Sequence, residues 1–452
     1  MLPLLLFLFV IFTLMLGYPV AFTLSGVSII FALVCSTFNY FDISILYALP
    51  SRIFGILTNE TLVAIPIFIF MGITLEKSKI AEKLLESMSA LFSSIKGGLG
   101  ISVIIVGALL AASTGIVGAT VVTMGLLSLP SMLKQNYDKK IATGTILASG
   151  TLGQIIPPSI VLILLGDVIS SSYQEAQNMQ GIFSQESVSV GDLFAGAIFP
   201  GLILVGFYIL FILFVSYFRE DLIPKNVIKE KLNFKKILLS LYAPLFLILI
   251  VLGTIILGIA TPTEASSFGA LGSIFLSYVN KKLNIQILKD ILIQTSKITS
   301  MIFILLIGAT IFSLVFRGLE GDVFVNEFLS DLPGDVYFKV FIVMATIFLL
   351  GFILDFIEIT YVVVPVVAPV LLAMGIDPIW LGILIAINLQ TSFLTPPFGF
   401  AIFYLKSVIP KEINTLEIYK GVIPFILIQV ITIIIIVLYP ELTTWLPNKI
   451  FG

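Results

Sequence analysis

Apolar stretches long enough to cross a membrane recur along the whole of this 452-residue chain. Residues 243–257 with their flanks and residues 421–438 are two examples. A helix needs about 20 apolar residues to cross the ~30 Å hydrocarbon layer of a bilayer. Only 11% of the residues are charged, and no long polar stretch remains from which a soluble domain could form. We therefore expect an all-helical, multi-pass membrane protein.

Several functional classes are disfavoured by what the sequence lacks. It has no histidine, which removes the HExxH zinc proteases and histidine proton relays. Its single cysteine, Cys35, allows no internal disulfide or multi-cysteine metal site and is expected to be a small core residue. Neither a GxxxxGK[ST] phosphate loop nor a GxSxG nucleophile motif occurs, so we expect no ATP hydrolysis and no enzyme activity. The apolar N-terminus lacks a basic region and is interpreted as a retained first helix.

The second half of the chain matches the first half in order. The matching pairs are Pro19 with Pro262, Gly26 with Gly269, Glu76 with Glu320, Pro130 with Pro369, Asp138 with Asp377, Pro157-Pro158 with Pro396-Pro397, and Pro200 with Pro424. Each pair is weak evidence, but their common order is difficult to obtain by chance. We expect a first repeat at 1–217 and a second at 237–440. A cytoplasmic linker at 218–236 joins them, and a C-terminal tail follows at 441–452.

Lysine and arginine residues indicate that the two repeats have opposite orientations in the membrane. Loop 170–192 has no basic residue, whereas its counterpart 406–420 has three lysines. Conversely, loop 134–140 has three lysines and its counterpart 374–380 has none. Loops 76–96 and 281–297 have four lysines each, and the linker 218–236 has six basic residues. Placing these lysine-rich loops in the cytoplasm, with 134–140 and 406–420, puts 20 of the 24 basic residues there. Because the bias reverses between equivalent loops, the repeat is expected to be inverted.

This charge distribution predicts a topology with about ten transmembrane helices and both termini outside. Residues 97–133 and 338–373 are expected to enter and leave on the same side, as re-entrant hairpins. A broken helix follows each hairpin, at about 141–168 in the first repeat and about 379–405 in the second. All basic residues are expected in loops, with none near the middle of a crossing.

Each broken helix carries a stretch of small polar residues that ends in two consecutive prolines. Proline has no N–H for the carbonyl four residues earlier, so each proline pair is expected to leave carbonyls without a donor. The carbonyls concerned are those of Gly153, Gln154, Ser392 and Phe393. Unpaired carbonyls in the membrane interior are costly unless a hard cation such as sodium binds them. We therefore predict a sodium and substrate site at the hairpin tips and broken helices.

The predicted site residues come from both repeats. The hairpin tips contribute Ser113, Thr114, Gly115, Asp355, Glu358 and Thr360, and the broken helices contribute Gly150, Thr151, Gly153, Pro157, Pro158, Asn388, Thr391, Ser392, Thr395, Pro396 and Pro397. Sodium, as the coupling ion, is expected at Ser113, Gly153, Thr391 and Ser392, and no other cofactor is expected. In the alternative, the prolines merely kink buried helices, and Ser, Thr and Gly pack those helices closely.

Three acidic residues lie at or near membrane depth, where charge usually has a role. Asp355 fits either a functional role or a loop cap. For Glu358 we favour function. Glu264 follows a tight turn that opens a helix, so an acidic cap in the first helical turn is the preferred interpretation.

At these segments the sequence resembles the large membrane subunit of the tripartite ATP-independent periplasmic (TRAP) transporters, over nearly the whole chain. The strongest parts are 144–158, 261–265 and Thr395-Pro396-Pro397. The resemblance implies sodium-driven uptake by an elevator motion in the bacterial inner membrane. It also implies two partners, a small four-helix membrane subunit and a periplasmic solute-binding protein. The tip Ser113–Gly118 differs from the commoner Gly-Ser tip and resembles the branch associated with mannitol, chloroaromatic and 2-oxo acid uptake.

Three alternatives remain beside a TRAP permease for a small organic anion. A self-sufficient sodium/carboxylate symporter of similar architecture would transport without a binding protein. A passive channel would carry currents far above the turnover of a carrier. An intramembrane enzyme would turn over substrate without depending on a gradient.

Overall fold

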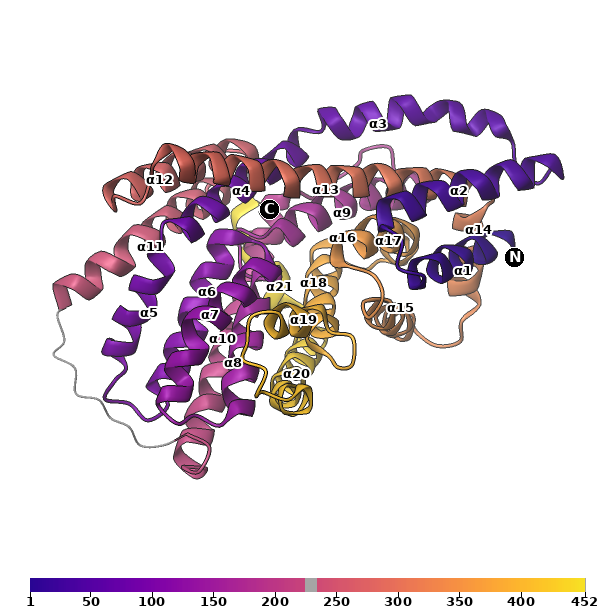
Figure 1. Cartoon of the computed structure of the whole chain (residues 1–452). Coiled ribbons are helices and arrows are strands. Elements are labelled where there is room, and N and C mark those ends of the chain that lie inside the picture. Colours follow the sequence, from indigo (N-terminus) through magenta and orange to yellow (C-terminus); the bar gives the residue numbers. More distant parts are fainter. Residues whose placement is uncertain (224–233, 452) are drawn as a thin grey trace. The chain divides into compact units, whose positions relative to one another are not determined.

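The computed structural model describes residues 1–223 and 234–451, and every element within these two ranges is helical (Figure 1). The predicted linker at 218–236 falls partly on residues 224–233, which lie outside the described residues. The chain forms two compact units, and each unit draws segments from both predicted repeats. Four helices, α4, α9, α13 and α18, have residues in both units.

Unit 1 comprises Met1–Val63, Ile163–Ser189 and Ser296–Gly382. Its elements are α1 (Leu2–Met15), α2 (Val20–Thr37), η1 (Ile43–Ala48), α3 (Leu49–Thr58), most of α9 (Ile160–Met179), the end of α13 (Ile285–Gly318), α14 (Gly321–Asp331), α15 (Val336–Leu350), α16 (Phe356–Glu358), the π-helical turn η3 (Ile359–Val363) and α17 (Val364–Ala373).

Unit 2 comprises Ala64–Leu162, Val190–Thr295 and Ile383–Gly452. Its elements are most of α4 (Glu60–Lys77), α5 (Ile80–Leu91), α6 (Gly98–Thr114), α7 (Val117–Lys134), α8 (Lys139–Thr151), η2 (Leu152–Gln154), α10 (Val190–Phe218), α11 (Phe234–Ile256), α12 (Pro262–Val279), most of α18 (Pro378–Leu394), α19 (Phe400–Lys406), α20 (Thr415–Leu438) and α21 (Glu441–Phe451). The predicted tail is thus helical up to Phe451, and α21 packs on α10.

Six helical segments in the described part of the chain are long and apolar enough to cross a membrane. They are Val20–Thr37, Val117–Lys134, Val190–Phe218, Ile285–Gly318, Phe356–Ala373 and Thr415–Leu438. A seventh span is possible if Ile43–Thr58 and Glu60–Lys77, which are bent by 50° at their junction, count as one. Shorter apolar helices of 10–17 residues lie among them, including α1, α6 and α15. The protein is therefore a multi-pass membrane protein.

Helix α12 begins with the cap that the sequence predicts. The Thr261 hydroxyl accepts from the N–H of Glu264 at 3.2 Å, and a Glu264 carboxylate oxygen accepts from the N–H of Thr261 at 2.8 Å. This reciprocal pair satisfies two N–H groups that have no partner within the helix. The interpretation of Glu264 as a helix cap is thus confirmed. Cys35, the predicted small core residue, is buried in α2.

Two segments that the sequence analysis treats as basic loops are helical instead. Within 76–96, α5 buries one face that includes Leu84 and Leu85, whereas Lys83 is exposed on the other. Within 281–297, α13 begins at Ile285 and carries Lys289 and Lys297 as exposed residues of its first turns. The expectation that all basic residues lie in loops is therefore wrong. Long lysine side chains extend their ammonium groups away from an apolar surface, so a helix accommodates them.

Residues matched between the two repeats occupy matching places in their helices. Pro130 lies inside α7 and Pro369 inside α17. The carboxylate of Asp138 accepts from the N–H of Lys140 at the start of α8, and Asp377 accepts from Trp380 at the start of α18. The two prolines and the two aspartate caps thus occur in comparable positions of their helices.

Within unit 2, α8 packs against α6, α7 and α20, so it lies at the centre of that unit. Gly144 of α8 and Gly421 of α20 make the closest of these approaches. A Cβ added at Gly144 would lie 2.1 Å from the Gly421 carbonyl oxygen, and one at Gly421 would lie 2.2 Å from the Lys140 carbonyl oxygen. Only glycine at both positions lets these two backbones meet.

Candidate functional site

The first predicted hairpin is formed by α6 and α7, which pack on each other and are separated by only two residues. Gly115 ends α6 with φ at +61°, a conformation that favours glycine, and Ile116 is extended. The Ser113 and Thr114 hydroxyls both donate to the Leu110 carbonyl at 2.9 Å. A hydroxyl that donates one hydrogen keeps lone pairs, so both oxygens are still able to coordinate a cation.

The hairpin tip meets the first proline turn. A Cβ on Gly115 would lie 3.1 Å from Ile160 Cγ1 and 3.3 Å from the Ile160 nitrogen, just after Pro157-Pro158. The Ser159 hydroxyl turns back and donates to the Gly153 carbonyl at 2.8 Å and to the Gln154 carbonyl at 3.0 Å. The prediction that these two carbonyls have no donor is therefore wrong. A side chain supplies the hydrogen that the prolines lack.

The second proline turn also satisfies carbonyls locally. The N–H of Thr395 donates to the Ser392 carbonyl at 3.1 Å. The prediction that the Ser392 carbonyl has no donor is therefore also wrong. Gly399 packs over the Phe393 carbonyl, whose oxygen would lie 2.6 Å from an added Cβ. The Thr391 hydroxyl donates to the Ile387 carbonyl at 2.8 Å, and the Thr395 hydroxyl donates to the Thr391 carbonyl at 2.7 Å.

Helix α19, which follows the second proline turn, packs on α7 of the first hairpin. A Cβ on Gly118 would lie 3.2 Å from the Tyr404 ring. Unit 2 therefore brings together the first hairpin and the segments around both proline turns. It contains the predicted site residues Ser113, Thr114, Gly115, Gly150, Thr151, Gly153, Pro157, Pro158, Asn388, Thr391, Ser392, Thr395, Pro396 and Pro397. The Pro157-Pro158 and Pro396-Pro397 peptide bonds are both cis.

Buried polar atoms next to the two proline turns lack partners. Among the described residues, both amide atoms of Gln154 and the hydroxyl of Ser392 make no hydrogen bond, although both side chains are fully buried. Such atoms are costly in a membrane interior unless a ligand, ion or water binds them. The Gln154 side chain was not among the predicted site residues. Its position directly before a proline turn was the available signal.

The second predicted hairpin lies in unit 1, and two acidic side chains cap the short helix at its turn. Asp355 and Glu358 form a reciprocal cap on the short helix α16: the N–H of Asp355 donates to Glu358 Oε2 at 2.9 Å, and Asp355 Oδ1 accepts from the N–H of Phe356 at 2.7 Å. The capping interpretation of Asp355 therefore has direct geometric support. Thr360 follows in η3, and within the described part of the chain its buried hydroxyl has no partner.

Polar residues that the sequence analysis missed gather elsewhere in unit 1. Asp167 of α9 accepts from the Asn59 side-chain amide at 2.8 Å and from the Tyr361 hydroxyl at 3.1 Å. Asp167 stands in an otherwise apolar run, so the rule that marks intramembrane carboxylates would have found it. Asn59 and Tyr361 carried no comparable signal.

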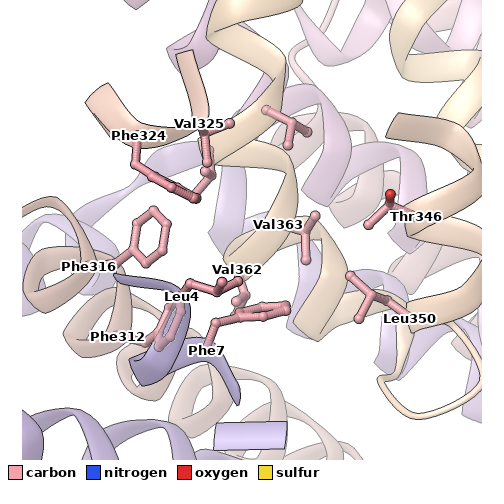
Figure 2. Close-up of a pocket in the computed structure, with 12 residues that line it drawn as sticks. Leu4, Phe7, Phe312, Phe316, Phe324, Val325, Thr346, Leu350, Val362 and Val363 are labelled. Carbon is pink, nitrogen blue, oxygen red and sulfur yellow. The ribbon is translucent and has the colours of Figure 1, made fainter. Parts of the chain in front are cut away.

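An apolar cavity of about 160 Å³ also lies within unit 1, and Figure 2 shows the side chains that line it. The rings of Phe7, Phe312 and Phe316 gather opposite Thr346 and Leu350. Thr346 provides the only hydroxyl in the lining, and it donates to the Ile342 carbonyl. An anion would lose its hydration here without gaining a partner, so this cavity does not suit a charged substrate.

A polar cavity of about 470 Å³ lies within unit 2. Glu82 and Glu86 both line it, beside the polar side chains of Ser89, Ser131 and Gln135. Two carboxylates repel an anion, so this cavity is also a poor anion site. Among the described residues no group of three or more acidic, histidine or cysteine side chains could hold a metal ion. A sodium site would therefore depend on carbonyl, hydroxyl and amide oxygens.

Comparison with known proteins places the chain in one family over almost its whole length. Residues 6–442 match the family described as "Tripartite ATP-independent periplasmic transporter, DctM component". A relative from Rhodobacter capsulatus, the C4-dicarboxylate TRAP transporter large permease protein DctM, is 29% identical over 395 residues, which cover 84% of this chain and 85% of that protein. The ectoine TRAP transporter large permease protein TeaC of Halomonas elongata is 30% identical over 386 residues, with 85% of each chain covered.

Among solved structures, the YdaH transporter of Alcanivorax borkumensis resembles this chain with a TM-score of 0.58. The match covers 88% of this chain and 89% of that one at 12% identity. At that identity the likeness concerns the fold alone. It shows that this helical arrangement is one that a known transporter adopts.

Proposed function

Because this chain belongs to the DctM-component family of the tripartite ATP-independent periplasmic transporters, we propose that it imports a small organic anion with sodium as the coupling ion. One observation supports this proposal most strongly. In unit 2 the first hairpin tip contacts the first proline turn, where Gly115 packs against the start of α9. Broken helices of this kind expose backbone and hydroxyl oxygens within the membrane, where transporters bind ions and substrate.

Sodium binding is proposed at Ser113, Gly153, Thr391 and Ser392. Hydroxyl and carbonyl oxygens are the ligands that hard cations prefer. A carbonyl oxygen has two lone pairs, so the Gly153 carbonyl can accept from Ser159 and still coordinate an ion. Among the described residues the buried Ser392 hydroxyl has no hydrogen-bond partner, which supports a bound ion at this site. Thr360 and Glu358 of the second hairpin are proposed as binding residues within unit 1.

The proposed topology has ten crossings, two re-entrant hairpins and both termini outside, in an inverted repeat within the bacterial inner membrane. Matched prolines inside α7 and α17, together with matched aspartate caps of α8 and α18, support the repeat. The two hairpins and broken helices are proposed to move together as an elevator. Short apolar helices such as α6 and α15 fit hairpin arms that do not cross the whole bilayer.

The proposed substrate is a small carboxylate such as a 2-oxo acid. The Ser113–Gly118 tip, which resembles the branch associated with mannitol, chloroaromatic and 2-oxo acid uptake, supports this choice. The relatives are named for C4-dicarboxylate and for ectoine, so membership of the family leaves the substrate open. Uptake of labelled pyruvate, with unlabelled succinate as competitor, distinguishes a 2-oxo acid from a C4-dicarboxylate permease.

Two further proteins are proposed as partners, because the family is tripartite. One is a small four-helix membrane subunit, and the other is a periplasmic solute-binding protein that captures dilute substrate. The longest predicted exterior loop, about 170–192, is too short to form a capture domain of its own.

Reconstitution into proteoliposomes tests the proposed function. We expect negligible pyruvate uptake by this chain alone, and uptake when the small subunit, an inward sodium gradient and loaded binding protein are all present. Removing any one of the three should return uptake to background. Robust uptake of free substrate by the isolated chain would instead support the self-sufficient symporter.

A further inference from the structure

A third cavity, of about 290 Å³, lies within unit 1 and is lined by charged and hydroxyl side chains. Arg52 of α3, Glu175 of α9 and Arg317 of α13 form part of its wall. Tyr361 and Pro365, which belong to the second hairpin, form another part. Of the three described cavities, this is the one whose lining includes arginine.

The two arginines differ in their ion pairing. Arg317 Nη2 lies 2.8 Å from Glu175 Oε2, and both side chains are about 30% exposed, so this ion pair is partly shielded from solvent. Arg52 makes no hydrogen bond or ion pair with any residue in the described ranges, although the charges of Arg317 and Glu175 act on it. The cavity wall therefore contains the Arg317 guanidinium, which has an ion-pair partner, and the Arg52 guanidinium, which has none among the described residues. A carboxylate is the ligand that a planar guanidinium binds best.

Asp167, an acidic residue in this wall, already has two hydrogen-bond partners. Both carboxylate oxygens of Asp167 accept hydrogen bonds, one from Asn59 at the junction of α3 and α4 and one from Tyr361 in η3. Asp167 therefore holds the cavity wall together at the point where α9 meets the hairpin. Glu175 is likewise occupied with Arg317. The lining thus holds two guanidiniums and two carboxylates, and the charge of Glu175 also acts on Arg52.

Hydroxyl groups complete the lining. Ser172, Thr310 and Ser313 line the cavity, and their hydroxyls make no hydrogen bond within the described part of the chain. Donors of this kind suit an oxo or hydroxyl oxygen close to a carboxylate. In the proposed topology, Arg52, Glu175 and Arg317 all stand at the outer ends of their helices. The cavity would then receive ligand from outside.

We propose that this cavity is an outer binding site for a small monocarboxylate with a neighbouring oxo oxygen, in which Arg52 holds the carboxylate and the Ser172, Thr310 and Ser313 hydroxyls hold the oxo group. The site deepens the proposed function and rests on it for the choice of ligand. Its lining belongs to unit 1 and includes Tyr361 and Pro365 of the second hairpin, whereas the proposed sodium ligands belong to unit 2. It would receive the anion before transport and would select for its charge.

Cysteine labelling of the detergent-solubilised complex with the small subunit tests this site without any transport. In a Cys35→Ser background, Ser313→Cys places a thiol in the cavity wall, and Ser184→Cys places one in the exposed 180–189 segment as a reference. Each is labelled with an anionic and a cationic methanethiosulfonate, and the ratio of the two rates cancels differences in thiol reactivity. The lining carries two guanidiniums and two carboxylates, so removing the charge of Arg52 leaves an excess of negative charge. An excess of one sign of charge in a cavity changes the local concentration of charged reagents by on the order of tenfold.

We expect the anionic-to-cationic ratio of the Ser313→Cys protein, divided by that of the Ser184→Cys protein, to fall by about tenfold when Arg52→Gln is added, because two carboxylates then face one guanidinium. Arg52→Lys should largely retain the ratio. Pyruvate should slow labelling of the Ser313→Cys protein, and neutral acetamide should not. A ratio unchanged by Arg52→Gln, or no protection by pyruvate, would each overturn the outer site. Sodium-independent uptake would count against the proposed function and leave these labelling results unaffected.

Discussion

At the scale of single residues, Ser159 changes how the first proline turn has to be understood. Two consecutive prolines remove two backbone donors, and the carbonyls of Gly153 and Gln154 would otherwise face a membrane interior without partners. One hydroxyl, placed directly after the prolines, reaches both oxygens. The turn is thus stable without an ion, and sodium would add to it rather than be required for it to form.

Replacing Ser159 with alanine should leave these carbonyls without their donor. We expect Ser159→Ala to destabilise the protein by on the order of 1 kcal/mol, since hydrogen bonds between membrane helices are worth about that much. Thermal unfolding of the purified protein in detergent measures the change. Ser267→Ala is the control, because the Ser267 hydroxyl also donates to a carbonyl, that of Thr263, but at an exposed position inside a helix. Equal melting temperatures for the two variants would contradict the assigned role of Ser159.

Thr391 tests the proposed sodium ligands. Its hydroxyl donates to Ile387 and keeps lone pairs for an ion, so Thr391→Ala should remove one ligand. We expect the sodium concentration for half-maximal uptake to rise severalfold, with little loss of maximal rate. Thr432→Ala is a matched control, because the buried Thr432 hydroxyl makes the same bond to the carbonyl four residues earlier, in α20. A shift of the same size in both variants, or in neither, argues against a ligand role.

At the scale of elements, the helix breaks and helix starts were the most predictable features. Proline pairs and small polar stretches indicated where helices break, and the Thr-Pro-Thr-Glu pattern predicted the α12 cap that the structure contains. The helices α5 and α13 were harder to predict, because lysines within an amphipathic helix resemble a basic loop. The role of Ser159 could not be predicted from the sequence either, because its hydroxyl bonds to carbonyls five and six residues earlier in the chain.

The second hairpin permits a test that separates capping from ion binding. Asparagine caps helices about as well as aspartate, so Asp355→Asn should keep the cap, whereas Asp355→Ala should cost about 1 kcal/mol. If Asp355 only caps α16, uptake by the Asp355→Asn variant should show the sodium dependence of the unaltered protein. We expect this result, because the observed hydrogen bonds already engage the side chain. A raised sodium requirement in Asp355→Asn, at unchanged melting temperature, would instead assign it an ionic role.

At the scale of the whole molecule, the sequence predicted the family and the class of fold better than the tertiary arrangement. Self-matching prolines and glycines indicated two repeats, and family membership is confirmed over residues 6–442. Each compact unit nevertheless combines segments from both repeats. Contacts such as that between Asp167 and Tyr361 join residues far apart in the chain, and nothing in their local sequence signals the pairing. The arginine-lined cavity went unpredicted for the same reason.

The proposed opposite orientation of the two repeats makes a direct prediction about sidedness. Ser184 and Ser407 lie in loops that the repeat makes equivalent, and both are exposed. In a Cys35→Ser background, Ser184→Cys should react with an impermeant reagent from outside the cell, and Ser407→Cys only after permeabilisation. Reaction of both positions from the same side would be the signature of a parallel repeat, and the proposed topology would fail.

The central claim, that this permease couples anion entry to sodium, is tested most directly by uptake under a controlled ion gradient. Proteoliposomes that contain the chain, the small subunit and loaded binding protein are given an inward sodium gradient, or the same salt concentration on both sides. We predict that pyruvate accumulates only with the gradient, and that an ionophore which dissipates the sodium gradient releases the accumulated pyruvate. Accumulation of equal size when choline replaces sodium would contradict the claim.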